Sequence, residues 1–537
     1  MLIPPLARRV VPSILVLLLV GLGLARYFAN MPHSFDILLD DEAVYLGVGT
    51  DFGHTILWPA GFPGVMASYE NGGLYSLIYG ALSALWPDPV DLYFFGGTTI
   101  VLAAVVLGFL ALWALSDSLL CAVLLACPVV LSGELMIWPR VSFAAIAVLA
   151  LALAAMRWAP PGGKVPILLG AAYLACFIRP EFVLSFYALA ILQLGMLGRL
   201  LLRRPPGRWR VEAGAGALSI GFVTVLSLCW SLPVPESGER AFAAFGQHFA
   251  LRYVEAHGLA LNPWLDWRQV MAEQFPGAGS TVQALLQRPG TVLAYFGTNL
   301  KELVGAILRL AATAIALYPV FFGVWALAVA AWIGATIAAR KPGHALPGRW
   351  FDLALVALFV LPPLVAAIGV YPRHHHMVLL LFAASAALAV LLRPLRVRLD
   401  PLLALGLAIA FVPSVEPVPV AAQPMLETIA QLRARLPIHR FYEIDGGWCY
   451  FLLPRCSTDY PAWRQAGEAL IPYVQTRGID AIMLSPRLTG YEAQHDPDFG
   501  AAVERLITEQ RWQRIELGHG YVLLTAPPSG ASGTAGP

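Results

Sequence analysis

Three acidic residues in a row, Asp40, Asp41 and Glu42, follow the first apolar stretch of the sequence after a short interval. Neighbouring carboxylates raise one another's pKa, so one of them can accept a proton from a hydroxyl while another binds a cation or orients a substrate. The same acids would also stabilise the N-terminus of a helix, because the helix macrodipole favours negative charge there. The segment therefore predicts either a general base or a helix start, and the residue types alone leave both open.

A further acid, Glu134, lies in a region that is otherwise strongly apolar, six positions before Arg140. An ionisable side chain at membrane depth is costly, so it is usually functional or paired with an opposite charge. Glu134 is therefore a candidate site residue, and an ion pair with Arg140 is the alternative.

Two arginines stand at the ends of apolar runs, where a bound phosphate would be accessible. Arg179 precedes Pro180-Glu181, and Arg373 precedes three consecutive histidines that begin with His374. A guanidinium presents a planar fork of donors to two phosphate oxygens. We expect Arg179 and Arg373 to bind a phosphate, with His374 assisting, whereas a local Arg179–Glu181 pair is the alternative. Consecutive histidines point in different directions on a helix and lack the i, i+4 spacing of two metal ligands, so they argue against a metal there.

The segment 241–249 combines phenylalanines with Gln247 and His248. Aromatic faces with amide and imidazole groups suit a sugar, which stacks on rings and offers many hydroxyls. An amphipathic helix at the membrane interface, where aromatic residues are common, would have the same composition.

Cys449 and Cys456 stand near the C-terminus, outside the apolar runs. Outside the cytoplasm such a pair can form a disulfide, which would close a short loop. Their expected role is structural.

The composition indicates the elements that must carry these residues. Hydrophobic residues make up 58% of the 537 residues and charged residues only 13%, against about 25% charged residues in a typical soluble domain. We therefore predict a mainly α-helical, polytopic membrane bundle with about 11 spans, each near the length that crosses a bilayer. The expected spans are 11–29, 94–115, 118–137, 141–156, 165–178, 181–198, 213–233, 313–338, 351–370, 376–392 and 401–414. The first range also fits a signal peptide, but no A-x-A cleavage site follows it, so an uncleaved span is preferred.

Basic loops fix the expected orientation, because Lys and Arg concentrate in cytoplasmic loops. Alternating spans place the basic loops on the side of the N-terminus: 157–164, 199–210, 339–350 and 393–400. This arrangement requires the range 290–312 to lie on the outer membrane surface as an interfacial helix instead of crossing. Two large loops, 30–93 and 234–312, and the chain from about 415 are then extracytoplasmic.

The sequence divides into a transmembrane domain over 1–414, a small α/β domain over 425–527 and a disordered tail over 528–537, which is rich in Gly, Ser and Ala. Strands are expected at 441–453, 479–485 and 513–525, and helices at 461–477 and 498–511. Alternating strands and helices predict a compact α/β fold for this domain.

The acidic segment and its surroundings resemble a known superfamily. Asp41-Glu42 with Tyr45 resembles the acidic signature in the first extracytoplasmic loop of the GT-C glycosyltransferases, which include aminoarabinose transferases and protein O-mannosyltransferases. Leu74-Tyr75 resembles a second motif of that loop, although the two prolines that precede it in the family are absent. The plan of a first span, a long first loop, many spans and an outer C-terminal domain is also similar.

The resemblance implies that Asp41 is the catalytic base, with Asp40 and Glu42 in support. It implies that Glu134 holds a metal or orients the acceptor. Residues expected at the donor phosphate are Arg179, Arg373 and His374, and residues expected to bind substrate are Tyr45, Gln247 and His248.

The implied partners are a polyprenyl-phosphate-linked sugar, membrane lipid, and a glycan, lipid or protein acceptor. No cofactor is required by the sequence, although a divalent metal such as Mg²⁺ or Mn²⁺ is compatible with the acids. The net charge of +2 gives no field that would attract nucleic acid. We expect a multi-pass protein of the inner membrane with a periplasmic C-terminal domain. The alternative is a polytopic transporter or flippase, in which charged sites would lie near the bilayer midplane.

Overall fold

The computed structural model describes residues 7–39, 41–55, 72–136, 140–203, 209–230, 232–233, 239–339, 349–393, 400–435, 437–452, 456–461, 464 and 468–527. The chain forms two compact units, which we call the helical unit and the sheet unit. The helical unit comprises Met1–Asn30, Leu57–Tyr75 and Gly97–Val418, and the sheet unit comprises Met31–Ile56, Ser76–Gly96 and Pro419–Pro537.

The helical unit is built mainly from long apolar helices. Its elements are α1 (Ala7–Phe28), α6 (Gly97–Ser116), α7 (Leu119–Leu131), η5 (Glu134–Met136), α8 (Val141–Trp158), α9 (Pro161–Cys176), η6 (Pro180–Phe182), α10 (Val183–Arg203), α11 (Trp209–Trp230), α12 (Glu239–His257), α13 (Trp267–Gln274), α14 (Thr281–Gln287), α15 (Pro289–Leu317), α16 (Pro319–Ala339), α17 (Arg349–Gly369), α18 (His374–Leu392) and α19 (Asp400–Ser414). Helix α4 (Gly73–Leu82) begins in this unit and ends in the other.

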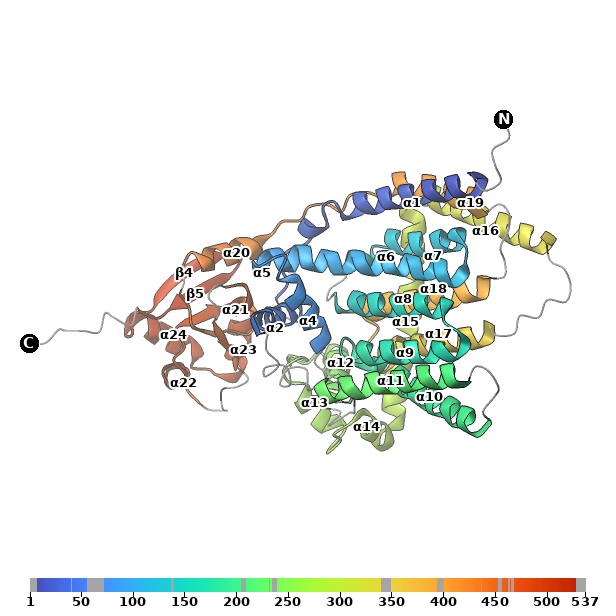
Figure 1. Ribbon diagram of the computed structural model, residues 1–537. Coiled ribbons are helices and arrows are strands. Elements are labelled where there is room, and N and C mark those ends of the chain that lie inside the picture. Colours follow the sequence, from blue (N-terminus) through green and yellow to red (C-terminus); the bar gives the residue numbers. More distant parts are fainter. Residues whose placement is uncertain are drawn as a thin grey trace, which may run out of the picture. The chain divides into compact units, whose positions relative to one another are not determined.

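The core of the helical unit is a set of helices that run alongside one another. Helix α8 packs against α6 and α9, and α9 packs against α11 (Figure 1). Helices α6 and α8 are apolar around most of their circumference, which is typical of helices surrounded by other helices or by lipid. Seven helices of the described chain are long and apolar enough to cross a membrane, and four shorter apolar helices accompany them. The chain is therefore a multi-pass membrane protein.

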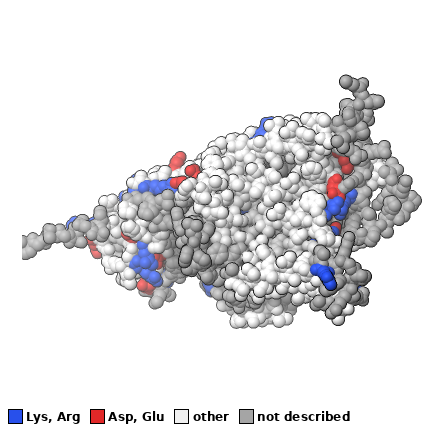
Figure 2. All heavy atoms as spheres, in the orientation of Figure 1, with Lys and Arg blue, Asp and Glu red and all other residues white. Residues whose placement is uncertain are grey.

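The charged residues of the helical unit are confined to small areas of its surface. In the face drawn in Figure 2 most of this unit is free of Lys, Arg, Asp and Glu, and charged atoms gather at its right-hand end. A surface of this kind needs an apolar solvent, which a bilayer supplies.

A helix occurs at each range expected to be a span, but two boundaries differ from the prediction. The span expected over 118–137 ends at Leu131, because Gly133 adopts a φ of +82° and the chain turns into η5. The span expected over 313–338 begins instead at Pro319, where proline starts a new helix. Residues 290–312 belong to the single 29-residue helix α15, which continues to Leu317.

Helix α15 exposes a row of large apolar side chains. Leu293, Leu300, Val304, Leu308 and Ile315 are all at least 45% exposed. Their spacing of seven and four residues puts them on one face of the helix. Such a face matches the expected contact with the membrane surface, which stays a prediction.

The sheet unit combines parts of the first loop with the C-terminal chain. Its elements are η1 (Met31–His33), α2 (Asp41–Thr55), α5 (Pro89–Asp91), η4 (Leu92–Gly96), α20 (Pro424–Arg433), β1 (Arg440–Tyr442), α21 (Trp448–Phe451), β2 (Ser457–Asp459), α22 (Leu470–Arg477), β3 (Ala481–Leu484), α23 (Pro486–His495), α24 (Phe499–Thr508), β4 (Gln513–Gly518) and β5 (Tyr521–Thr525). Hydrogen bonds and an ion pair are among the contacts that join the loop to the C-terminal chain. Asp36 accepts hydrogen bonds from the first backbone N–H groups of α20, and Arg433 pairs with Asp88 at 2.7 Å.

The five strands are ordered β2-β1-β3-β5-β4. Strand β1 is parallel to β2 and β3, whereas β5 is antiparallel to β3 and β4. The strand expected over 441–453 is wrong beyond Tyr442, because Gly446 and Gly447 adopt positive φ angles and the chain turns into α21. The range 513–525 is a hairpin of two strands, and β2 was not predicted. The expected disordered tail lies outside the described residues.

Candidate functional site

One polar cluster lies at the C-terminal ends of α8 and α18. Arg157 and Arg393 both contact Asp117, at 2.6 Å and 3.1 Å. Lys164 pairs with Asp352, which Arg393 also approaches at 3.7 Å. The basic residues at 157–164 and at 393 therefore lie at one end of the helical unit, as their placement in loops of the same side predicted.

A second polar cluster lies at the opposite ends of the same helices. Arg140 begins α8 and Arg157 ends it, while His374 begins α18 and Arg393 follows its end. A helix of 18 residues is about 27 Å long, close to the thickness of the hydrocarbon core of a bilayer. The two clusters are thus separated by about the width of a membrane.

Glu134 lies in this second cluster, in the turn between α7 and α8. The turn is fixed by the positive φ of Gly133 and by the backbone N–H of Glu134, which donates to Ser132 Oγ at 3.2 Å. The Glu134 residue is only 4% exposed, and its carboxylate lies 3.0 Å from Nδ1 of His374. Burial raises the pKa of Glu134, and the facing His374 opposes this shift. The Glu134–His374 pair can hold or transfer a proton at this end of the helical unit.

Arg140, the alternative partner considered for Glu134, is buried at the start of α8. Its guanidinium packs against Gly97, where any side chain larger than hydrogen would collide with it. The close approach explains why a glycine begins α6 at this level.

Arg179 makes the local pair that was the alternative to phosphate binding, and it makes a second contact as well. Its Nε donates to Glu181 Oε1 at 2.8 Å, and its Nη2 lies 3.0 Å from Nδ1 of His376. The three side chains come from the α9–α10 turn and the start of α18, and all are largely buried. They form one hydrogen-bonded group whose net charge is small.

The three consecutive histidines have separate surroundings, as expected for adjacent positions on a helix. His374 is 70% exposed and faces Glu134, His375 is buried, and His376 faces Arg179. In the described residues no group of three His, Cys, Asp or Glu side chains converges as metal ligands would. Glu134 and His374 supply two such groups, which is fewer than metal sites normally use.

Arg373 lies on the segment 370–373, which joins α17 to α18 and is held from both sides. Tyr295 and Asn299 of α15 donate hydrogen bonds to the carbonyl of Val370. The guanidinium of Arg252 lies 4.9 Å from the centre of the Tyr371 ring. Arg252 in turn pairs with Glu302 and donates to the side chain of Asn299 at 2.9 Å. This framework fixes the backbone just before Arg373.

The Arg373 guanidinium lies 5.5 Å from the ring centre of Trp264. Gln247 donates to the carbonyl of Trp264 at 3.1 Å, and His248 packs between Trp264 and Tyr371. Gln247 and His248, expected to bind substrate, thus contact the groups that position Arg373.

His248 is buried and neutral. Burial lowers its pKa to about 3, and the nearby charges of Arg373, His376 and Arg252 act in the same direction. Its Nδ1 has no hydrogen-bond partner among the residues that the structure describes.

The acidic segment belongs to the sheet unit, where Asp40 lies outside the described residues. Asp41 and Glu42 form the first turn of α2, so the placement fits both a helix start and a candidate base. Asp41 is exposed, whereas Glu42 is buried and accepts a hydrogen bond from the Tyr79 hydroxyl. Tyr45 lies one turn further along α2 and is half-buried.

Helix α2 is packed closely on both sides within the sheet unit. A side chain at Gly47 would collide with the ring of Tyr450, and one at Gly49 would collide with the backbone of Ser76. Tyr450 follows Cys449, which forms a disulfide with Cys456. The disulfide-bonded turn therefore supports the helix that carries Asp41.

Several contributors to these clusters have no local sequence signal. Arg252 and Glu302 are 50 residues apart, and Asn299 lies 71 residues from Val370. In the sheet unit, Glu443 was not predicted either: burial raises its pKa to about 7, although its carboxylate accepts hydrogen bonds from the backbone N–H groups of Gly446 and Gly447.

Comparison with known proteins gives one structural likeness. No protein-family model matches the chain, and no curated protein matches it. Among solved structures it is similar to ArnT from Cupriavidus metallidurans bound to undecaprenyl phosphate, with 11% identity and a TM-score of 0.42 over 96% of this chain and 98% of that one. An identity and a TM-score this low do not transfer function, so function depends on the site residues themselves.

Proposed function

We propose that this protein is a membrane glycosyltransferase that moves a sugar from a polyprenyl-phosphate donor to an acceptor hydroxyl on the extracytoplasmic face. The observation that carries the proposal is the cluster around Arg373, His374 and Glu134, which lies across the bundle from the basic end of the helical unit. Basic ends stay in the cytoplasm, so this cluster would face outward. In that orientation, a lipid phosphate in the outer leaflet would lie at the level of this cluster.

The chemistry of this cluster suits a departing phosphate. As the bond between the anomeric carbon and the phosphate oxygen breaks, the electron pair leaves with the phosphate and negative charge grows on its oxygens. Arg373, whose backbone is fixed in advance by α12 and α15, would stabilise that charge without reorganising. His374 would add a hydrogen-bond donor. Arg179 is paired with Glu181, so we assign it a secondary part in phosphate binding.

We assign the role of base to Asp41, in line with the resemblance of its segment to the GT-C family. Its carboxylate would accept the acceptor's hydroxyl proton while that oxygen attacks the anomeric carbon. A single displacement of this kind inverts the anomeric centre. Asp41 is exposed at the start of α2, whereas Glu42 is buried and accepts a hydrogen bond from the Tyr79 hydroxyl.

A binding experiment tests the phosphate role of the cluster. Purified protein in detergent would be titrated with a polyprenyl phosphate, and the dissociation constant of Arg373→Ala compared with that of the unaltered chain. Loss of one charge-assisted contact of about 1.5–3 kcal/mol should weaken binding about 10- to 150-fold. Arg268→Ala is the matched control, because Arg268 also lies over a tryptophan ring, at 4.7 Å from Trp267.

Equal affinity of Arg373→Ala and the unaltered protein would contradict the assignment of Arg373. If neither protein bound any polyprenyl phosphate, the glycosyltransferase proposal would lose its support and a transporter of another substrate would be favoured.

A further inference from the structure

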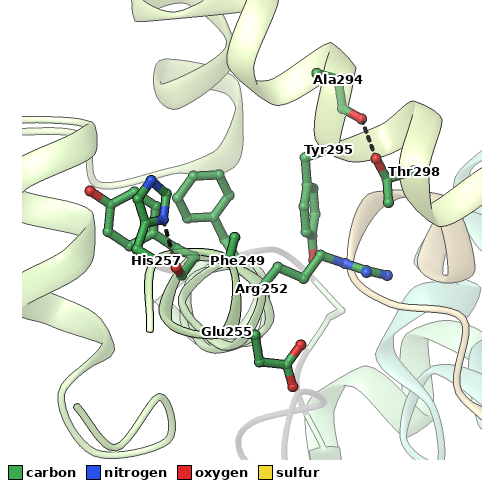
Figure 3. Close-up of a pocket in the computed structure, with 9 residues that line it drawn as sticks. Phe249, Arg252, Glu255, His257, Ala294, Tyr295 and Thr298 are labelled. Carbon is green, nitrogen blue, oxygen red and sulfur yellow. Dashed lines mark hydrogen bonds between the residues drawn. The ribbon is translucent and has the colours of Figure 1, made fainter. Parts of the chain in front are cut away.

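An open groove lies between α12 and α15, in the part of the helical unit formed by the large loop before α16. Its volume is about 550 Å³, which is within the range of small-molecule sites in proteins. Figure 3 shows Phe249, Glu255 and His257 of α12 on one side and Tyr295 and Thr298 of α15 on the other. All of these residues belong to one unit and are separate from Arg373.

The groove is lined by aromatic rings held in fixed positions. Tyr253 lies nearly parallel to Phe249, with ring centres 6.2 Å apart, and contacts His257 at 4.2 Å. The Tyr253 hydroxyl donates to Glu273 and accepts from Gln274, both at 2.9 Å. These bonds hold the Tyr253 ring from its far end. Phe249, one turn before, and His257, one turn after, lie against this ring, so the three rings form a column that ends at the exposed His257. A rigid aromatic face is the surface on which the C–H face of a sugar ring packs, and it binds at low entropic cost.

The polar groups of the groove suit neutral hydroxyls better than a phosphate. Glu255 and Thr298 are exposed at its rim, and their oxygens accept hydrogen bonds from hydroxyls. The cation in the lining, Arg252, is already paired with both carboxylate oxygens of Glu302. The groove therefore has no surplus positive charge for an anion.

The groove is connected to the segment that carries Arg373. Arg252 and Tyr295, which line it, also contact the ring of Tyr371 and the carbonyl of Val370. We propose that this groove binds a saccharide, and, given the proposed transferase function, that this saccharide is part of the acceptor. A sugar packed at His257, on the end of this ring column, would then occupy a groove that shares Arg252 and Tyr295 with the framework of Arg373.

Saturation-transfer NMR on the full-length protein in detergent tests the saccharide site without any need for turnover. The probes are neutral di- and trisaccharides of glucose, galactose, mannose and N-acetylglucosamine. We expect saturation of ring protons for at least one probe. Tyr253→Ala removes the ring that supports His257 and should weaken binding of that probe about 2- to 10-fold. His257→Ala should weaken binding in the same direction.

Tyr491→Ala is a matched control. Tyr491 and His495 form the same helical pair in α23, with ring centres 4.1 Å apart and His495 Nδ1 2.8 Å from the Tyr491 carbonyl. This pair lies outside the groove, so the variant should bind the probes as the unaltered protein does. No saturation of any probe would overturn the proposal, as would equal binding by Tyr253→Ala. Binding of an aromatic peptide in place of every saccharide would also overturn it.

The outcome can be separated from that of the proposed function. Tyr253→Ala should leave the affinity for polyprenyl phosphate unchanged and raise only the acceptor KM, whereas Arg373→Ala should lose the donor. If polyprenyl phosphate failed to bind but saccharide binding still depended on Tyr253, the groove would stand as a saccharide site and only its acceptor role would fail.

Discussion

At the scale of residues, side chains that are adjacent in the sequence take different roles because a helix directs them differently. His374 faces Glu134 at the surface of the cluster, and His376 binds Arg179 in the interior. His248 is held neutral between Trp264 and Tyr371. Each of these histidines therefore gives a different response to substitution.

The buried His248 should make stability depend on pH. Its folded pKa of about 3 lies below the ordinary value of 6.5, so the unfolded chain binds more protons between these values and acid favours unfolding. The stabilising contribution is complete above pH 6.5 and is lost as the pH falls towards 3. We expect a loss of about 2 kcal/mol between pH 7 and pH 5. The measurement is thermal unfolding in detergent at both pH values.

His248→Phe is the comparison for this prediction, because phenylalanine keeps the ring contacts and cannot be protonated. The difference in stability between pH 7 and pH 5 should be smaller in this variant by about 2 kcal/mol. An identical difference in the two proteins would show that another group causes the pH dependence.

The Glu134–His374 pair should be more important for turnover than for stability. His374 is largely exposed, so its pairing contributes little to folding, and His374→Ala should change the free energy of unfolding by less than about 1 kcal/mol. If it assists the phosphate, kcat should fall while the melting temperature is nearly unchanged. A large drop in melting temperature with normal turnover would make the pair structural.

At the scale of elements, α12 and α15 form a framework that fixes the segment before α18. Asn299 is fully buried on α15 and donates to the carbonyls of Ile368 and Val370. Two carbonyls at the end of α17 thus receive hydrogen bonds from a helix more than 60 residues away. The position of Arg373 depends on this framework.

Asn299→Leu should remove that support. The carbonyl of Ile368 would lose the hydrogen bond from Asn299, whereas that of Val370 would keep its bond from Tyr295. A buried group left unsatisfied costs about 1–3 kcal/mol. We expect a lower melting temperature and weaker binding of polyprenyl phosphate, although Asn299 is not expected to touch the ligand. Lys301→Ala, an exposed change on the same helix, is the control and should leave both unchanged. Unaltered ligand binding in Asn299→Leu would contradict the positioning role.

The helices could be predicted from the sequence because an apolar run near 20 residues long has few alternatives to a span. The ends of the helices and strands were harder to predict. Helix α7 ends early because Gly133 takes a positive φ, and β1 ends at Tyr442, shortly before two glycines with positive φ. Arg373 and Glu134 were expected as site residues from their types. The residues that position them, such as Asn299, were not predicted. Asn299 and Val370 are 71 residues apart in the sequence, and local spacing does not indicate a contact between residues so far apart.

At the scale of the whole molecule, charge is arranged at the two ends of the helical unit. One end carries Arg157, Lys164 and Arg393 with their acidic partners, and the other carries Glu134, Arg179 and Arg373. The positive-inside rule assigns the first end to the cytoplasm. The same rule, with the expected number of spans, puts the C-terminal α/β chain outside.

Cysteine labelling can test this orientation. A membrane-impermeant maleimide should label Gln510→Cys in intact spheroplasts, because residue 510 lies in the C-terminal chain expected outside. It should label Arg199→Cys, at the basic end of α10, only after the membrane is permeabilised. The unaltered chain gives the background of the six native cysteines: Cys449 and Cys456 are disulfide-bonded, Cys121, Cys127 and Cys176 are buried, and any labelling of Cys229 is measured directly in this chain. The reverse pattern would invert the orientation and move the Arg373 cluster to the cytoplasm.

The most direct test of the central claim is sugar transfer by the purified protein in reconstituted membranes. Radiolabelled sugars on a polyprenyl phosphate would be supplied with envelope glycans, lipids and proteins as acceptors, and Asp41→Asn would be compared with the unaltered chain. Asp91→Asn, an exposed acid in the same unit, is the control. We expect transfer from one donor that falls about 100- to 10,000-fold in Asp41→Asn, as expected for a lost general base, and is unchanged in Asp91→Asn. Equal transfer by Asp41→Asn and the unaltered protein would contradict it.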